Sequence, residues 1–580
     1  MIGHRGPISG VACWRDTYVA TAGYDNQVIL WDAATATSSM RVQHDHLANQ
    51  CAFSPDGKWL VSSSSDYSAR LWSVPGLRLH AVLDAHEDDV EMSVFHPTAE
   101  LIATASRDHQ VRVFDFTGTL VKTFRGHTAD VISIEWSADG DGLISSSDDG
   151  TVKRWSFATG QLVSNLDMDG VETDTVVLTA DGVIYAGNDE GDIVTVRLDG
   201  SRTKIHAHDS GVKRLVLGVS QGLLVSLSYD RTAKMWDLTG SDLTLVNSTT
   251  VPDDVWARSC AFGGGESLIF GTFGRTYRTF DYGLNQWEAM LVPPTYGVNA
   301  VVPLSRPGEV LTIGDAGIVR CEYTLGGGNE VARMGSLCNF LTPIDELVLT
   351  GGQLGKMFDA LTGRSLYQHR SPLNCGTRFT RSGHGHALIG SYTGEGLIFR
   401  VEGAETTHVG NLPMLRNAIK GVAAGDRLLF AVCADCSVTW WDAETLEHVR
   451  TVRNAHDRII NGCVSIGGDQ FATVGRDLML RIWSPSGQAE VLHTPHRNSI
   501  KCISATDDGQ VIATGGYHGM IALVELSSRS WIQVQRPTTS GISSLSYDAA
   551  SRTFIAGSYD GNVYRISRDR PPAPASRGPK

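Results

Sequence analysis

The sequence predicts an all-β protein built from fourteen copies of one unit of about 41 residues. Residues 126–155 illustrate the unit: a loop, a strand at 131–136, a second strand at 143–147, a turn, and a third strand that ends at Trp155. The same order of elements recurs along the chain at intervals of 37 to 44 residues. The 62 glycines fit a fold with many tight turns. Such regular spacing indicates a repeat architecture.

A bulky residue on the third strand marks each copy. The fourteen markers are Trp31, Trp72, Phe114, Trp155, Val196, Trp236, Phe280, Cys321, Phe358, Phe399, Trp441, Trp483, Val524 and Ile566. Six positions earlier, ten copies carry an acidic residue at the turn: Asp25, Asp66, Asp108, Asp149, Glu190, Asp230, Asp315, Asp435, Asp477 and Asp560. The other four carry Gly274, Gly352, Thr393 and His518, so the turn persists where the acid is replaced.

Length and charge restrict the class of protein. At 580 residues the chain exceeds what one hydrophobic core supports, so at least two domains are expected. The net charge of −14 argues against binding to nucleic acid, which requires an excess of Lys and Arg. No apolar stretch has the length of a signal peptide or a membrane helix, so we expect a soluble, cytoplasmic protein with no membrane partner. Its ten cysteines are then free thiols.

The repeat resembles the WD-repeat (WD40) family through Trp31-Asp32, Trp236-Asp237 and Trp441-Asp442, and through Gly3-His4 and Gly126-His127. This resemblance implies four-stranded blades arranged around a central channel. Fourteen copies favour two seven-bladed β-propellers in tandem over one large ring. The expected limits are 1–290 for the first propeller, 291–568 for the second, and 569–580 for a flexible proline-rich tail. Because prolines follow Ile566, the last blade is expected to have three strands and an open edge.

A histidine accompanies the turn residue at fixed spacing in seven copies. The pairs are His4 with Asp25, His44 with Asp66, His86 with Asp108, His127 with Asp149, His208 with Asp230, His456 with Asp477, and His496 with His518. A catalytic site needs one arrangement in one pocket, so this repetition favours a structural hydrogen bond in each blade. The resemblance adds a second-strand hydroxyl and the tryptophan to that bond. The expected structural residues therefore also include Trp31, Trp72, Trp155, Trp236, Asp435, Trp441 and Trp483.

Signals for metal or cofactor chemistry are weak. Cys433 and Cys436 form a CxxC, but no second CxxC accompanies it and Asp435 between them is the turn residue of the repeat. No phosphate-binding loop, HExxH or plausible GxSxG is present. We therefore expect no cofactor and no metal. A channel-centred hydrolase or lyase remains an alternative, since residues from several blades can converge in a propeller channel.

The residue just before the turn acid is expected to lie on one face of the propeller, where loops carry binding specificity. Large aromatic and arginine side chains are common at these positions, as in protein interfaces. The expected partner-binding residues of this kind are Tyr24, Arg107, Tyr229, Phe273, Tyr392, Arg476, Tyr517 and Tyr559. Surface positions near the first strands add Asp89, Glu91, Asp130, Lys213 and Lys501.

These features predict a noncatalytic scaffold that binds one or more proteins as a subunit of a complex. The acidic residues Asp89, Glu91 and Asp130 predict a basic or mixed-charge partner segment at the first propeller. Tyr392, Arg476, Tyr517 and Tyr559 make the second propeller the favoured main partner site. A reader of modified peptides is a further alternative, because Arg476, Tyr517 and Tyr559 are residue types suited to an arginine cluster or an aromatic cage.

Overall fold

The computed structural model describes residues 2–567 apart from residues 241, 290, 291, 294, 296, 305, 307 and 324–327. The elements of this part are all β-strands. No helix long and apolar enough to cross a membrane occurs among these residues. The expected tail at 569–580 lies outside the described residues. The chain divides into two compact units, Met1–Thr295 and Tyr296–Lys580.

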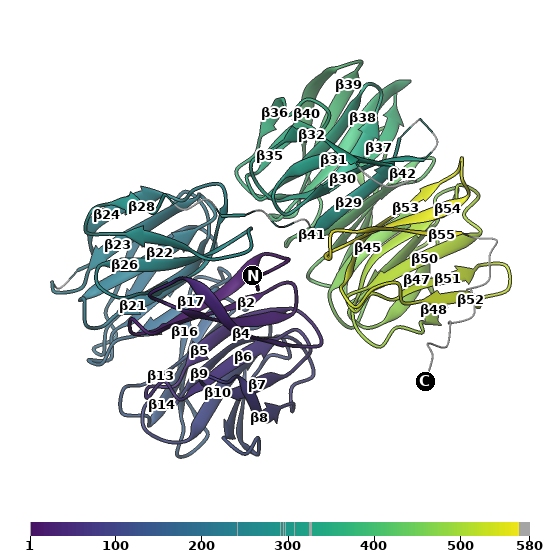
Figure 1. Ribbon diagram of the computed structural model, residues 1–580. Coiled ribbons are helices and arrows are strands. Elements are labelled where there is room, and N and C mark those ends of the chain that lie inside the picture. The colour runs from purple at the N-terminus through teal and green to yellow at the C-terminus, as the bar shows by residue number, and fades with distance from the viewer. Residues whose placement is uncertain are drawn as a thin grey trace, which may run out of the picture. The chain divides into compact units, whose positions relative to one another are not determined.

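The first unit contains seven four-stranded antiparallel sheets, each made from one continuous stretch of chain (Figure 1). Their strands are β1 (Ile8–Trp14), β2 (Tyr18–Gly23), β3 (Gln27–Asp32) and β4 (Thr37–Gln43); β5 (Ala48–Phe53), β6 (Trp59–Ser64), β7 (Ala69–Ser73) and β8 (Arg78–Leu83); β9 (Val90–Phe95), β10 (Leu101–Ser106), β11 (Gln110–Asp115) and β12 (Leu120–Arg125); β13 (Val131–Trp136), β14 (Gly142–Ser147), β15 (Thr151–Ser156) and β16 (Leu162–Asp167); β17 (Thr175–Leu178), β18 (Ile184–Gly187), β19 (Asp192–Val196) and β20 (Arg202–His206); β21 (Val212–Gly218), β22 (Leu223–Ser228), β23 (Thr232–Asp237) and β24 (Thr244–Thr250); and β25 (Val255–Phe262), β26 (Ser267–Thr272), β27 (Arg278–Asp281) and β28 (Gln286–Trp287).

The second unit contains six four-stranded sheets and, among the described residues, one of three strands. Their strands are β29 (Val298–Pro303), β30 (Glu309–Gly314), β31 (Ile318–Tyr323) and β32 (Gly328–Arg333); β33 (Cys338–Ile344), β34 (Leu347–Gly352), β35 (Lys356–Asp359) and β36 (Ser365–Gln368); β37 (Leu373–Arg381), β38 (His384–Ser391), β39 (Glu395–Glu402) and β40 (Glu405–Pro413); β41 (Ile419–Ala424), β42 (Leu428–Cys433), β43 (Val438–Asp442) and β44 (His448–Val452); β45 (Ile460–Ser465), β46 (Phe471–Gly475), β47 (Met479–Trp483) and β48 (Ala489–His493); β49 (Ile500–Ala505), β50 (Val511–Gly516), β51 (Ile521–Glu525) and β52 (Ser530–Gln535); and β53 (Ile542–Asp548), β54 (Thr553–Ser558) and β55 (Val563–Ser567). Each of the fourteen marker residues lies on the third strand of its own sheet.

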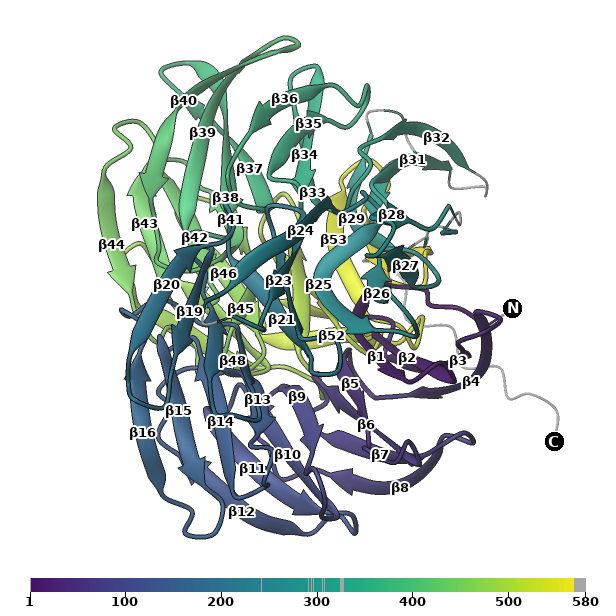
Figure 2. The same cartoon turned by 90° about the vertical axis from the view of Figure 1, so that its left-hand side faces the viewer.

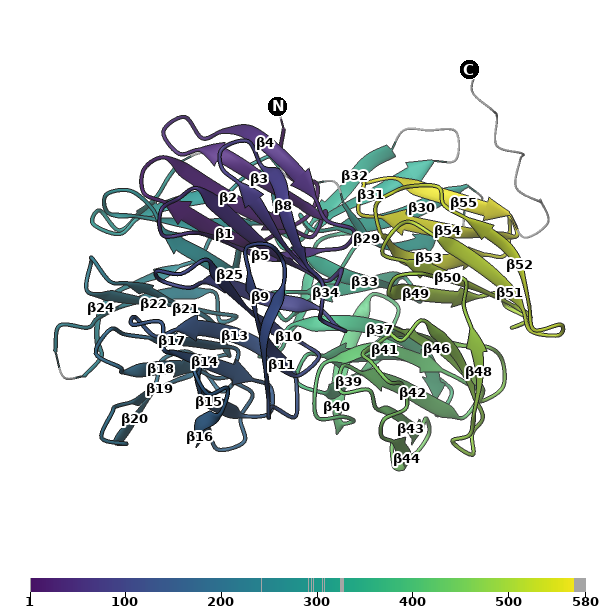
Figure 3. The ribbon, with the colours of Figure 1, turned by 90° about the horizontal axis from the view of Figure 1, so that it is seen from below.

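The opening strands of the sheets follow one another in a cycle within each unit. In the first unit, contacts run from β1 through β5, β9, β13, β17 and β21 to β25, which contacts β1 again. In the second unit they run from β29 through β33, β37, β41, β45 and β49 to β53, which contacts β29. Opening strands of the first unit lie toward its middle in Figure 3, and its closing strands β8, β12, β16 and β20 lie along its margin in Figure 2. Side chains at the starts of opening strands therefore come from several sheets to one central region.

The apolar core lies between successive sheets. Between the third and fourth sheets, for example, Phe124, Ile134 and Trp155 are buried together. The seventh and first sheets share a core of the same kind, in which Ile8, Trp31 and Ile269 pack together. A smaller cluster of Val298, Val301, Val310 and Ile555 joins the last and first sheets of the second unit. Burial on both faces of each sheet explains why the strands contain long apolar runs.

Two local features shape the central end of each sheet. A register shift interrupts the pairing at the start of most opening strands, as at Val131/Ser133 in β13 and Val212/Arg214 in β21. Such a bulge bends the strand and redirects the side chains that precede it. The residue after the turn acid adopts a positive φ, which glycine accommodates best. At Gly150, with φ of 74°, an added Cβ would lie 2.6 Å from the Gly170 backbone.

Candidate functional site

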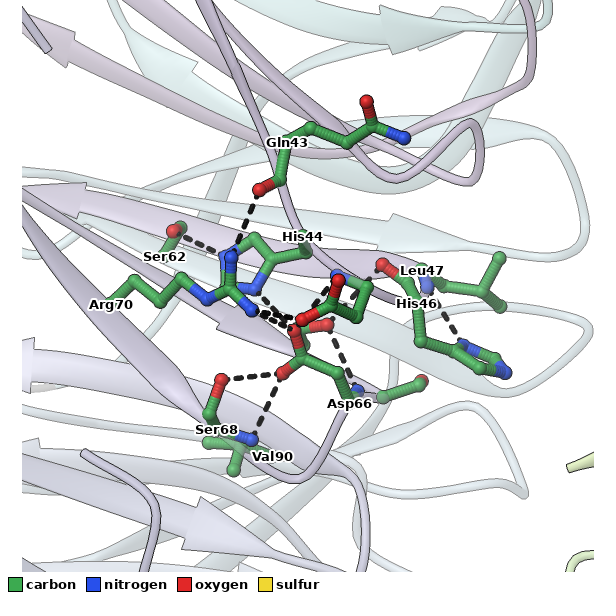
Figure 4. A network of polar contacts seen from close by, with 12 residues as sticks. Gln43, His44, His46, Leu47, Ser62, Asp66, Ser68, Arg70 and Val90 are labelled. Carbon is green, nitrogen blue, oxygen red and sulfur yellow. Dashed lines mark hydrogen bonds and ion pairs between the residues drawn. The ribbon is translucent and has the colours of Figure 1, made fainter. Parts of the chain in front are cut away.

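Six sheets contain the same hydrogen-bond network. In each, histidine Nδ1 lies 2.8–3.0 Å from a carboxylate oxygen of the turn aspartate, and Nε2 lies 2.6–2.8 Å from a serine or threonine hydroxyl on the second strand. The pairs brought together are His4–Asp25, His44–Asp66, His86–Asp108, His127–Asp149, His208–Asp230 and His456–Asp477. Figure 4 shows the copy in the second sheet, where His44 lies between Ser62 and Asp66.

The tryptophan completes five of these networks. Its Nε1 donates to the same hydroxyl at 2.8–2.9 Å in the sheets that contain Trp31, Trp72, Trp155, Trp236 and Trp483. A neutral histidine that donates from Nδ1 to the aspartate must accept the hydroxyl proton at Nε2, so every polar atom of the group has a partner. Burial acts to raise the pKa of Asp66, but the hydrogen bond from His44 and the charge of Arg70 hold it well below its usual range. These hydrogen bonds stabilise the sheets that contain them.

Two sheets of the second unit with expected structural residues, Asp435 and the pair His496 and His518, depart from this network. Asp435 has no histidine partner among the described residues; its Oδ1 accepts from the Ser437 backbone, and Trp441 Nε1 donates to Thr439 at 3.1 Å. In the other sheet, His496 Nε2 lies 2.9 Å from the Thr514 hydroxyl, and the turn residue is His518. Burial, with the neighbouring His518, lowers the pKa of His496 to about 4.

The CxxC cysteines, Cys433 and Cys436, are free thiols, as are the other eight cysteines of the chain. Burial, reinforced by Asp435, raises the pKa of Cys433. The thiol is therefore not activated as a nucleophile. Among the described residues, no group of three or more His, Cys, Asp or Glu side chains is arranged to hold a metal ion.

The most unusual chemistry lies at the central end of the third to seventh sheets in the first unit. Backbone hydrogen bonds fix its frame, since the residue before the turn acid donates its N–H to a carbonyl just before the opening strand, as Arg107 does to Asp89 and Asp148 does to Asp130. The side chains that meet there include seven carboxylates and three cations: Asp89, Glu91, Asp130, Asp148, Glu172, Asp174 and Asp189, with Arg107, Lys213 and Arg258. We call this set the acidic centre.

Ion pairs connect the acidic centre across sheets. Arg107 Nε lies 2.5 Å from Glu91 Oε1, and its Nη1 lies 2.7 Å from Asp130 Oδ2 in the next sheet. Arg258 Nη2 lies 3.4 Å from Glu91 Oε2. Lys213 pairs with both Asp174 and Asp189. With four more carboxylates than cations, the acidic centre carries excess negative charge.

The excess of carboxylates, together with burial, raises the pKa of three carboxyl groups of the acidic centre. Burial, followed by Asp189 and Asp174, raises the pKa of Glu172 to about 7. Burial also raises the pKa of Asp189 to about 6, although Lys213 opposes the shift. The pKa of Asp148 is raised well above its usual range by burial and by Asp130, Asp174 and Glu172. These carboxyl groups resist ionisation because burial and mutual repulsion disfavour the charged form.

An aromatic wall borders the acidic centre at the seventh and first sheets. Trp256 stacks on Phe273 with ring centroids 5.6 Å apart and meets the edge of Tyr24 at 5.1 Å. The Arg258 guanidinium lies 5.4 Å from the Trp256 ring centroid, and Lys213 Nζ lies 5.1 Å from that of Tyr229. Cations and aromatic faces attract each other at these distances. The centre therefore combines carboxylates with aromatic surface.

Four of the expected partner-binding residues are not exposed as the sequence led us to expect. The exposed fractions are 2% for Asp89, 7% for Glu91, 4% for Phe273 and 8% for Tyr517. Asp89 accepts a hydrogen bond from Ser65 at 2.8 Å, Glu91 pairs with Arg107, and Phe273 stacks on Trp256. Tyr517 stacks on Tyr559 with centroids 6.3 Å apart. The expectation of surface exposure is wrong here because contacts within a sheet, for Glu91 and Phe273, and with the adjacent sheet, for Asp89 and Tyr517, cover these side chains.

The remaining expected partner-binding residues divide between the two units and are half-buried. Tyr24, Arg107, Asp130, Lys213 and Tyr229 lie at the acidic centre. Tyr392, Arg476, Lys501 and Tyr559 belong to the second unit. There, Lys420 Nζ lies 5.3 Å from the centroid of Tyr392. Whether these residues bind a partner remains a prediction.

Sequence reasoning missed Glu172, Asp174 and Arg258 of the acidic centre and Trp256 of the aromatic wall. A signal was available for Glu172 and Asp174, because both precede the first strand of the fifth sheet, as Asp89 precedes that of the third. The fifth copy lacks the loop histidine, which obscured the alignment. Arg258 lies within a long irregularity between Val255 and Cys260, where the strand pairing does not follow the repeat.

Comparison with known proteins identifies the repeat. The family model described as "WD domain, G-beta repeat" matches six segments, residues 1–32, 38–73, 77–115, 118–156, 200–237 and 489–523. The chain contains WD repeats. Five of the six matched segments belong to the first unit, and the sixth belongs to the second.

Curated relatives of the chain align over part of their length. The transcriptional corepressor LEUNIG_HOMOLOG of Arabidopsis thaliana is 23% identical over 282 residues, which cover 40% of the chain and 36% of the relative. Nuclear distribution protein nudF of Aspergillus niger is 29% identical over 193 residues, covering 29% and 44%. Target of rapamycin complex subunit wat1 of Schizosaccharomyces pombe is 24% identical over 231 residues, covering 38% and 73%. The chain thus spans less than half the length of the first two relatives.

Proposed function

We propose that this protein is a noncatalytic scaffold whose two units are seven-bladed β-propellers, with domain limits near 1–290 and 291–568. The cyclic contacts of the opening strands support two separate propellers. The His–Asp networks support the noncatalytic assignment, because their polar atoms are used within each sheet. Relatives named as a corepressor and a complex subunit are consistent with a role in protein assemblies.

We propose that the acidic centre is a binding site for a protein partner. Its carboxylates outnumber its cations, and the half-buried rings of Tyr24 and Tyr229 lie beside them. A basic segment of a protein partner would relieve the repulsion among the carboxylates and contact these rings. We assign this role to the first unit, with Tyr24, Arg107, Asp130, Lys213 and Tyr229 at the site.

The proposed partner is a protein, with neither a membrane nor nucleic acid as a binding surface. The net charge of −14 supports the exclusion of nucleic acid. A cytoplasmic location is part of the proposal and is supported by ten free cysteines, which suit a reducing compartment.

The second unit supplies a further protein-contact surface in this proposal, formed by Tyr392, Arg476, Lys501 and Tyr559, with the buried Tyr517 stacked behind Tyr559. The stacked rings of Tyr517 and Tyr559 and the lysine over Tyr392 support it, since these residue types dominate interface hot spots. A Tyr392→Ala/Tyr559→Ala variant should lose a subset of partners that the acidic centre does not bind.

Affinity capture with mass spectrometry tests the role of the acidic centre. The full chain is compared with an Asp148→Asn/Glu172→Gln variant, which replaces two carboxyl groups by amides but keeps the ion pairs of Arg107 and Lys213. Asp141→Asn, an exposed change in the same sheet, is the matched control. We expect a specific partner to be retained by the wild type and the control and lost from the double variant. Equal recovery by all three proteins would reject the acidic centre as a partner site.

A further inference from the structure

Cations alternate with carboxylates around the acidic centre, except at one place. Arg107, at the turn of the third sheet, bridges Glu91 and Asp130 and so joins the third and fourth sheets. Lys213, on the sixth sheet, pairs with Asp174 and Asp189 of the fifth. Between the fourth and fifth sheets, the turn position that corresponds to Arg107 is occupied by Asp148. Among the described residues, carboxylates therefore face carboxylates at this junction.

The side chain of Asp148 indicates independently that a hydrogen-bond donor is lacking at the junction of the fourth and fifth sheets. Its Oδ1 is buried and accepts no hydrogen bond from a described residue. Its backbone N–H is fixed by the carbonyl of Asp130, 3.0 Å away, which holds the residue in place. A buried carboxyl oxygen without a hydrogen-bond partner is costly, so this atom calls for a partner that the surrounding side chains do not supply.

We infer that one arginine side chain of a protein partner binds between the fourth and fifth sheets of the first unit, where Asp130, Asp148 and Glu172 meet. This inference rests on the proposed function and names the group that the acidic centre recognises. A guanidinium presents five N–H donors in a plane and can bridge carboxylates from two sheets, whereas an ammonium is a point charge. Arg107 already bridges two sheets in this way at the adjacent junction.

A divalent cation fits the site less well. The described residues include no group of carboxylates, thiols or imidazoles arranged as a metal cage. Asp130 and Asp148 belong to the fourth sheet and Glu172 precedes the fifth, so a bound cation would contact side chains of two sheets. The partner's arginine would complete the alternation of charge that Arg107 and Lys213 begin.

Binding at this junction is expected to strengthen as the pH rises. Asp148 faces Asp130 on its own sheet, Glu172 and Asp174 on the fifth sheet, and Arg107 on the third. Glu172 faces Asp189, Asp174, Lys213 and Asp130. Because burial and these carboxylates raise the pKa of Glu172 to about 7, a fraction of the site is protonated at neutral pH. A guanidinium binds the ionised form, so binding releases protons and is favoured above pH 7.

A blocked pentapeptide, Gly-Ser-Arg-Ser-Gly, provides a direct probe when paired with its citrulline counterpart, which has the same shape without the charge. Binding to the full chain is followed by saturation-transfer NMR between pH 5.5 and pH 8. We expect the arginine peptide to bind at least tenfold more tightly than the citrulline peptide, with affinity rising with pH. Equal binding of the two peptides, tighter binding of a lysine peptide, or competition by calcium ions alone would overturn the inference.

Two variants separate loss of the site from loss of the fold. Asp148→Arg supplies the cation from within the chain, so it should abolish peptide binding and raise the thermal unfolding midpoint. Asp141→Asn should leave both unchanged. A variant Asp148→Arg that still binds the arginine peptide, or that unfolds at a lower temperature than the wild type, would contradict the assigned position.

The outcome also distinguishes this inference from the proposed function. If affinity capture loses its partner in the Asp148→Asn/Glu172→Gln variant while the arginine and citrulline peptides bind equally, the acidic centre is an interface that does not recognise arginine. If capture is unchanged and the arginine peptide binds selectively, the arginine site exists but does not retain that partner.

Discussion

Replacing His518 by aspartate should restore the His–Asp pair in the sheet where His496 and His518 meet. In six other sheets the histidine Nδ1 lies 2.8–3.0 Å from the turn aspartate. His496 occupies the same position, since a Cβ added to Gly516 would lie 2.7 Å from its Nδ1, as one added to Gly23 would lie 2.5 Å from Nδ1 of His4. Its Nε2 already meets the Thr514 hydroxyl. The carboxylate at the turn position is therefore the group that this sheet lacks to form the His–Asp pair.

The magnitude follows from the protonation of His496. Burial, with His518, lowers its pKa to about 4, while an unfolded histidine titrates near 6.5. Because the folded state binds fewer protons, stability is present above pH 6.5 and is lost as the pH falls toward 4. Between pH 8 and pH 5 this linkage costs the wild type about 2 kcal/mol. His518→Asp should remove most of that loss and add about 1–2 kcal/mol at neutral pH through the charge-assisted hydrogen bond.

Hydrogen exchange measured by mass spectrometry reports this local stability. After correction for the intrinsic rate, the protection of β50 and β51 in the wild type should fall about thirtyfold from pH 8 to pH 5, which corresponds to 2 kcal/mol. In the variant, the protection of β50 and β51 should fall less than threefold over the same pH range. The sheet that contains His456 and Asp477 is the internal control and should behave alike in both proteins. The same pH dependence of β50 and β51 in the two proteins would refute the reasoning.

Three further predictions concern the networks, the core and the acidic centre. Ser145→Ala leaves His127 and Trp155 without their shared hydroxyl, so calorimetry should show a loss of about 2 kcal/mol or more, against no change for the exposed Ser527→Ala. Ile8→Ala opens the buried core between the seventh and first sheets and should cost about 3 kcal/mol by urea denaturation, whereas Ile532→Ala, at a 46% exposed site, should cost little. Glu172→Gln removes a carboxyl group whose folded pKa is raised to about 7. The stabilising effect of this substitution should therefore grow from pH 5 to pH 8 in thermal scans. An unchanged difference across that range would show that Glu172 ionises normally.

Much of the fold follows from the repeat itself. The marker residues fall on third strands because a buried aromatic residue and a turn at fixed spacing specify the register of a hairpin. The pairing of His127 with Asp149 could be anticipated for the same reason, since both positions recur in every clear copy. The open edge at β55 was also anticipated and is present among the described residues, where the last sheet has three strands.

The acidic centre was anticipated only in part. Asp89, Glu91 and Asp130 were recognised as acidic, but their exposure depends on neighbours from other sheets, which no single copy encodes. Arg107 pairs with Glu91 on its own sheet and with Asp130 on the next sheet. The sequence separations of these two contacts do not follow the period of the repeat. Arg258 and Trp256 lie in the irregular strand of the seventh sheet, where the repeat gives no register.

The central claim is that a protein partner binds at the acidic centre, and photo-cross-linking from its rim tests this most directly. His109 is suitable because its side chain is 49% exposed and its Nε2 lies 3.8 Å from Asp130 Oδ1. Val163, 64% exposed on the outer strand β16, is the control position. With a benzophenone amino acid at each position, a partner should cross-link at residue 109 and not at residue 163, and the cross-link should disappear when Asp148→Arg is added. A partner that cross-links at residue 163 alone, or at residue 109 regardless of Asp148→Arg, would contradict the claim.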